Sequence, residues 1–143
     1  MMSIFKNKST KNILLVDDDQ MQLTLISRQI MMAKPIINEN IDVDLAGSFN
    51  EAKLLLTNKQ YDLVVTDYLL GDGATGDDII QFGRMSNQKC DYKVLTAVKD
   101  IGLTRRLLTL GVSTILQKPC NLKDAFGILT GVVSFKKVKG NYG

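Results

Sequence analysis

Four apolar residues, Ile13–Val16, run directly into three adjacent aspartates, Asp17, Asp18 and Asp19. A continuous apolar run of this length is typical of a strand that is buried on both faces, as strands are in parallel sheets. Carboxylates packed this closely at the end of such a strand repel one another and are costly to remove from water. We therefore expect a cation at this point, and a hard divalent ion that prefers oxygen ligands is the best match.

The length and the residue types exclude several classes of protein. A chain of 143 residues is the size of one ordinary domain. It has no apolar run of about 18 residues and no signal-peptide segment at its start, so we expect a cytoplasmic protein without membrane contact. Cys90 and Cys120 form neither a disulfide framework nor a metal-ligand pattern. Without any histidine, the chain has no His-dependent triad and no phosphohistidine of its own.

The net charge of +3 is carried by the two ends of the chain, which hold Lys6, Lys8, Lys136, Lys137 and Lys139. The rest of the chain contains 13 of the 18 basic residues and all 15 acidic residues, so its net charge is negative. We therefore expect no nucleic-acid binding from the body of this domain.

Strand and helix patterns alternate along the chain. Apolar runs predict strands at Ile13–Val16, Ile41–Leu45, Leu63–Thr66, Tyr92–Thr96 and Thr114–Gln117. Spacing and capping residues predict helices at Met21–Met32, from a cap at Ser48 or Asn50 through Leu56, at Asp77–Met85, at Ile101–Leu110 and from Asn121 to about Phe135. This alternation predicts an α/β fold, a doubly wound five-stranded parallel sheet with helices on both faces. Acidic residues at the ends of the first and third strands favour the flavodoxin-like order 2-1-3-4-5.

Polar residues stand at the carboxyl ends of four of these strands. Asp17 and Asp18 follow the first strand, Asp67 the third and Lys118 the fifth, and Thr96 ends the fourth. Since these ends share one edge of a parallel sheet, the five side chains are expected to converge. Carboxylates bind a Mg²⁺-like ion, an ammonium offsets surplus negative charge, and a hydroxyl donates to an anionic oxygen. Such a site is suited to receive a phosphoryl group on a carboxylate.

Four motifs in this order resemble the receiver domain of two-component response regulators, a bacterial signalling family. They are I-L-L-V-D-D-D at Ile13–Asp19, Y-D-L-V-V-T-D-Y-L-L-G-D-G at Tyr61–Gly73, V-L-T-A at Val94–Ala97 and L-Q-K-P at Leu116–Pro119. The resemblance covers residues 11–135. It leaves residues 1–10 as an N-terminal extension and 136–143 as a basic tail or the start of a linker.

The resemblance implies a role for each site residue. Asp67 would be the phosphoacceptor, and Asp17, Asp18, Asp67 and the backbone carbonyl of Leu69 would hold Mg²⁺, Asp17 directly or through water. Thr96 and Lys118 would contact the phosphoryl group, and the peptide bond between Lys118 and Pro119 would be cis.

The implied function is phosphorelay signalling by a regulatory domain that catalyses only its own phosphorylation and slow dephosphorylation. The phosphoryl group would come from a sensor histidine kinase or a phosphotransfer protein, and a homodimer through the face of the fourth helix, fifth strand and fifth helix is possible. A pseudo-receiver that acts as a scaffold without phosphate is the alternative. A flavodoxin-like cofactor binder or a phosphatase-type enzyme would need a phosphate-cradling loop after the first strand, where this chain has aspartates.

Several positions depart from the common receiver pattern. Gly71 stands where many receivers have proline, which leaves the geometry of that loop open, and Cys120 replaces a frequent phenylalanine close to the site. Ile115 replaces a tyrosine or phenylalanine that acts as a rotamer switch, so we expect signals to travel through loop and helix shifts. Leu69 and Val98 are apolar at the positions that tune the phosphoryl lifetime, which predicts slow self-dephosphorylation.

Overall fold

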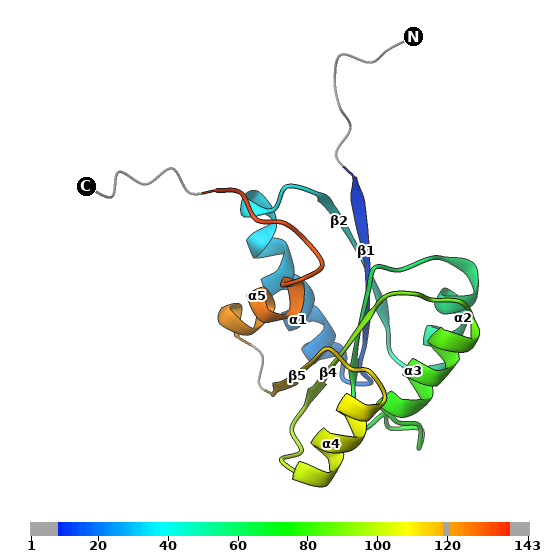
Figure 1. Ribbon diagram of the computed structural model, residues 1–143. Coiled ribbons are helices and arrows are strands. Elements are labelled where there is room, and N and C mark those ends of the chain that lie inside the picture. Colours follow the sequence, from blue (N-terminus) through cyan, green and yellow to red (C-terminus); the bar gives the residue numbers. More distant parts are fainter. Residues whose placement is uncertain (1–8, 119–120, 138–143) are drawn as a thin grey trace.

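The computed structural model describes residues 9–118 and 121–137. Five parallel strands form one sheet in the order β2-β1-β3-β4-β5, with helices on both faces (Figure 1). The strands are β1 Thr10–Val16, β2 Asn40–Ala46, β3 Leu63–Asp67, β4 Asp91–Thr96 and β5 Thr114–Gln117. The helices are α1 Gln20–Ala33, α2 Phe49–Asn58, α3 Gly76–Met85, α4 Ile101–Thr109 and α5 Leu122–Leu129, with a short 3₁₀ turn η1 at Lys34–Ile36. The predicted fold class and strand order are confirmed.

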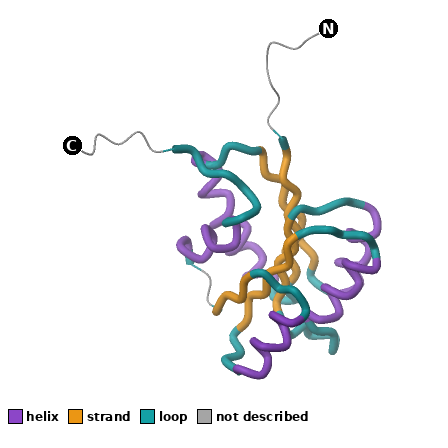
Figure 2. Tube along the Cα trace, viewed as in Figure 1, coloured by secondary structure: helices purple, strands orange, loops and turns teal. Residues whose placement is uncertain are grey.

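The central strand β1 supplies side chains to two separate cores. Ile13 and Leu15 pack with α1 and α5 on one face, and Leu14 and Val16 pack with α2, α3 and α4 on the other. All four are at most 2% exposed, and burying such a side chain contributes roughly 1.5–3 kcal/mol. Figure 2 shows the strands between the two helical layers. The sheet is therefore held on both sides, and the ends of its strands have fixed positions.

Short polar side chains begin the helices that follow the strands. Asp19 accepts hydrogen bonds from the backbone N–H groups of Met21 and Gln22 at the start of α1. Ser48, the first of the two predicted caps, accepts from Glu51 at 3.1 Å at the start of α2. These bonds satisfy N–H groups that have no partner within the helix. The third aspartate of the cluster is thus a helix cap.

The last helix is shorter than its sequence predicts. Helix α5 ends at Leu129, whereas the apolar pattern favoured a helix to about Phe135. Gly131 has a φ of +86°, which turns the chain back, and Phe135 pairs in antiparallel fashion with Ile37. Val133 enters the core beneath α1. Tertiary packing against the α1–β2 connection therefore replaces the last helical turns. At the other end of the domain, β1 begins at Thr10, three residues before its predicted start.

Within the described ranges, no helix is long and apolar enough to cross a membrane.

Candidate functional site

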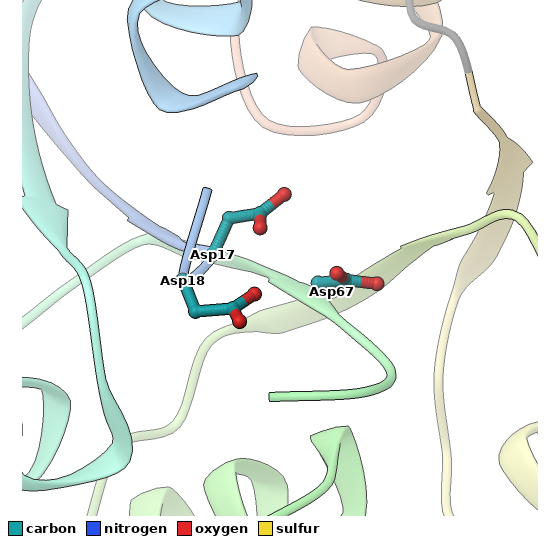
Figure 3. A group of neighbouring side chains, drawn as sticks. All are labelled: Asp17, Asp18 and Asp67. Carbon is teal, nitrogen blue, oxygen red and sulfur yellow. The ribbon is translucent and has the colours of Figure 1, made fainter. Parts of the chain in front are cut away.

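The two central strands bring three carboxylates to one edge of the sheet. Asp17 and Asp18 follow β1, and Asp67 is the last residue of β3, whose Thr66 is in register with Val16. Each carboxylate offers one oxygen, and these oxygens all lie within 4.8 Å of one another. Figure 3 shows the three side chains gathered at the ends of their strands. The predicted convergence of these aspartates is what the fold produces.

Lys118 reaches this cluster from the end of β5. Its Nζ donates to Asp17 Oδ2 at 2.7 Å and to Asp67 Oδ2 at 2.9 Å. Its side chain is only 16% exposed. Burial by itself lowers the pKa of Lys118, but the hydrogen bonds to both carboxylates outweigh this and raise it above the ordinary value. The lysine is therefore a firmly charged cation in the middle of the site.

The three carboxylates have different surroundings. Asp17 is 2% exposed, and its Oδ1 accepts a hydrogen bond from the backbone N–H of Asp19 at 3.0 Å. Asp18 is exposed, whereas the Asp67 side chain is mostly buried. Burial raises the pKa of Asp67 above its ordinary value; the hydrogen bond from Lys118 opposes this shift, and the Asp17 carboxylate adds to it. Burial thus makes the negative charge of Asp67 costly, as expected of a reactive group.

Thr96 lies at the end of β4, next to the cluster. It is 2% exposed, and its Oγ1 accepts a hydrogen bond from the backbone N–H of Val98 at 3.0 Å. The backbone N–H of Lys118 donates to the Thr96 carbonyl at 2.9 Å, which ties the ends of β4 and β5 together. A hydroxyl that accepts one hydrogen bond can still donate its own hydrogen.

The loop after Asp67 is tightly folded, and Gly71 lies against the acidic cluster. The backbone N–H of Leu70 bonds to the Ala74 carbonyl, and Leu69 pairs with Thr75. A Cβ atom on Gly71 would lie 2.4 Å from Asp18 Oδ2, well inside van der Waals contact. Glycine is therefore needed because the loop backbone approaches the carboxylate closely. The sequence showed a flexible residue here but carried no signal of this approach.

A second ionic group lies near the site, and the sequence pattern did not predict it. Arg106 of α4 binds Asp77 of α3 and donates to the hydroxyl of Tyr68 at 2.9 Å. Tyr68 directly follows Asp67. Arg106 lies on the solvent-exposed face of α4, with its side chain 57% exposed, whereas Asp77 is a buried first-turn residue of α3 at 8% exposure. Their separation of 29 residues left no local pattern to detect.

Two expectations lie outside the described residues. These are the cis peptide bond before Pro119 and the placement of Cys120 near the site.

Fold and site together define a class of protein: a five-stranded doubly wound domain with an acidic cluster and a lysine at its carboxyl edge. The response regulator receiver domain family model matches residues 13–129, most of the chain, and the protein belongs to this family. No curated protein sequence matches the chain. As a receiver domain, the protein is a regulatory domain.

Solved structures of receiver domains resemble this fold closely. The HemR receiver domain of Leptospira biflexa has 29% identity and a TM-score of 0.71, covering 90% of this chain and 98% of that chain. The chemotaxis protein CheY4 of Vibrio cholerae has 21% identity and a TM-score of 0.75, covering 87% and 99%. A Burkholderia pseudomallei response regulator, whose structure holds a phosphorylated aspartic acid, a calcium ion and citrate, has 21% identity and a TM-score of 0.70, covering 85% and 67%.

Proposed function

We propose that the domain accepts a phosphoryl group on Asp67 from the phosphohistidine of a sensor histidine kinase or phosphotransfer protein, and that this changes which proteins it binds. The observation that carries the proposal is the ammonium of Lys118, 2.9 Å from a mostly buried Asp67 that stands beside two further carboxylates. A cation fixed at this distance can pair with the charge that a phosphoryl group brings.

The residues present suit a magnesium ion. Three carboxylates outnumber the single ammonium of Lys118, and their oxygens lie close enough together to share one ion. In the proposal Asp18 ligates Mg²⁺ directly and Asp17 directly or through water, together with Asp67 and the backbone carbonyl of Leu69. When bound, Mg²⁺ supplies positive charge to the oxygens of the transferring phosphoryl group.

The protein's own side chains bind and orient the transferring phosphoryl group. An Asp67 oxygen bonds to phosphorus as the bond from phosphorus to the donor nitrogen breaks. Lys118 already contacts Asp67, so it can pair with a phosphoryl oxygen after a small movement. Thr96, held by the Val98 N–H, donates its hydroxyl hydrogen to another phosphoryl oxygen.

The domain acts together with other proteins. Because this chain contains no histidine, the donor is another protein, and both act in the cytoplasm of a bacterium. Residues 11–135 form the receiver, residues 1–10 an extension and 136–143 a tail or linker. Exposed apolar residues on α4 and α5, namely Ile101, Leu108 and Leu122, support a homodimer through the α4–β5–α5 face. Neither nucleic acid nor membrane is a partner of this domain.

Phosphorylation by a small donor tests the proposal. Wild type, Asp67→Asn and Asp72→Asn are incubated with Mg²⁺ and acetyl phosphate, and their intact masses are compared. Asp72 is an exposed carboxylate in the same loop and serves as the matched control. We expect one added phosphoryl group on wild type and on the control, and none on Asp67→Asn. A wild type that gains no mass, and binds no beryllofluoride, would instead favour the non-phosphorylated scaffold.

A further inference from the structure

Helix α4 has fewer fully buried residues than any other α-helix in the described part of the chain. Leu107 is its single fully buried residue, while Leu103 and Leu110 are only partly covered. By contrast, α1 buries Leu23, Ile26, Ile30 and Ala33. A helix with so little buried apolar surface can shift at low cost in free energy. The position of α4 therefore depends strongly on its hydrogen bonds and ion pairs.

The main polar attachment is a three-residue group, Asp77, Arg106 and Tyr68, which we call the Arg106 bridge. The guanidinium of Arg106 binds Asp77 Oδ2 and donates to Tyr68 Oη at 2.9 Å. The Asp77 side chain is 11% exposed, and its Oδ1 has no hydrogen-bond partner among the described residues. Losing Arg106 would leave the Asp77 carboxylate without its cation, and because the Arg106 side chain is 57% exposed this costs no more than a weak to moderate ion pair.

The other end of the bridge belongs to the Asp67 loop. Tyr68 is the next residue after Asp67, and its carbonyl accepts a hydrogen bond from Gly76 at 2.7 Å. A Cβ atom on Gly76 would lie only 3.3 Å from the Asp67 carbonyl oxygen. The end of β3 and the start of α3 are thus packed backbone to backbone. A displacement of Asp67 has to move Tyr68, the residue through which α4 is attached.

We propose that the Arg106 bridge holds α4 in its resting position, and that phosphorylation of Asp67 weakens the bridge and frees α4 to move. This inference rests on the proposed phosphorylation of Asp67. An interaction made only in the resting state opposes phosphorylation by the free energy with which it stabilises that state. The bridge therefore sets both how readily the domain is phosphorylated and how strongly α4 responds.

The first arm of the test needs no phosphate. Hydrogen exchange of peptides covering Ile101–Thr109 is compared in wild type, Arg106→Gln and Arg105→Gln. Arg105 is its exposed neighbour on the same helix, so its replacement makes the same change of charge and serves as the control. We expect α4 amides to exchange about two- to five-fold faster in Arg106→Gln, as for loss of a weak to moderate ion pair, with Arg105→Gln close to wild type.

The second arm measures the beryllofluoride affinity of the same proteins in Mg²⁺ buffer. Tyr68→Phe and Asp77→Asn are added because each removes one partner with little change of shape. We expect Arg106→Gln to bind beryllofluoride about two- to five-fold more tightly than wild type and Arg105→Gln, with the two added variants shifted in the same direction.

The outcomes separate this inference from the proposed function. If wild type binds no beryllofluoride and gains no phosphoryl group, the proposed function fails, and the coupling fails with it. If wild type binds but Arg106→Gln shows unchanged or weaker affinity, the proposed function stands and the coupling is overturned, even when α4 exchange rises. Tighter binding with unchanged α4 exchange also overturns it, because the bridge would then not be what holds α4.

Discussion

Lys118 Nζ and Asp67 Oδ2 lie 2.9 Å apart although 51 residues separate them in the sequence. The contact exists because β3 and β5 end at the same edge of the sheet, on either side of β4. It does not fully offset burial, since the pKa of Asp67 remains raised. The ionised carboxylate of Asp67 therefore lowers the stability of the folded domain.

Replacing Asp67 by asparagine should stabilise the domain at pH 7 without Mg²⁺. Because the folded-state pKa of Asp67 is raised, the folded state binds a proton more readily than the unfolded state, and the ionised carboxylate destabilises the fold above that pKa. We expect Asp67→Asn to gain on the order of 1 kcal/mol in urea unfolding. The gain should shrink as the pH falls through the folded-state pKa. Asp18→Asn, at an exposed carboxylate, is the control, and a less stable Asp67→Asn at pH 7 would contradict the prediction.

Removing the lysine should separate metal binding from phosphoryl transfer. The Lys118 ammonium occupies one oxygen of Asp17 and one of Asp67, so Lys118→Met removes a cation that competes with Mg²⁺. We expect Mg²⁺ affinity, measured by titration calorimetry, to be equal to or higher than that of wild type. The rate of phosphorylation by acetyl phosphate should fall on the order of a hundredfold, because the charge partner of the phosphoryl group is gone. A variant that keeps its rate would show that Lys118 has no such role.

Gly71 controls the position of Asp18. The Cβ atom of Gly71→Ala would meet Asp18 Oδ2 at 2.4 Å, so the carboxylate has to turn away from the cluster. We expect Mg²⁺ affinity to fall about tenfold, as when a supporting residue of a metal site is lost, with little loss of folding stability. Gly73→Ala is the control: it has a φ of +86° with nothing within 4 Å, so it should cost about 1 kcal/mol of stability and leave Mg²⁺ affinity nearly unchanged. Equal effects of the two variants on Mg²⁺ binding would contradict this account.

The sheet and most of the site are predictable because their signals are local. A strand buried on both faces reads as an uninterrupted apolar run, as at Ile13–Val16, and the residue that follows the run marks the carboxyl edge. Parallel topology then brings Asp17, Asp67 and Lys118 together without further information. These three charged site residues could therefore be predicted from the sequence pattern alone.

The features that the sequence did not reveal depend on contacts between distant segments. The pairing of Phe135 with Ile37 ends α5 early, although Val132 and Val133 fit a helical pattern equally well. The closeness of Gly71 to Asp18 is likewise a property of the folded loop, since any loop glycine looks alike in the sequence.

Apolar side chains next to the acceptor should make the phosphorylated state long-lived. Leu69 is two residues past Asp67 and Val98 two past Thr96; they are 56% and 37% exposed, and neither can orient an attacking water. We expect a phosphoryl half-life of hours in Mg²⁺ buffer, measured as the loss of the added mass over time. Leu69→Asn should shorten it about tenfold or more, and Leu69→Met, which stays apolar, should not. A wild-type half-life under a minute would contradict this prediction.

The thiol of Cys90 should react slowly in the folded domain. Burial raises its pKa to about 11, with the Asp91 and Asp62 carboxylates adding to the shift and Tyr92 and Arg84 opposing it. At pH 8 roughly 0.1% would be thiolate, against roughly a quarter for an unperturbed thiol, so reaction with a disulfide reagent should be about a hundredfold slower than for a free peptide thiol. The measurement uses Cys120→Ser, which leaves Cys90 as the single cysteine. The rate should climb with pH towards 11 and become ordinary in urea, whereas a fast reaction in the folded protein at pH 8 would show that the thiol is not shielded.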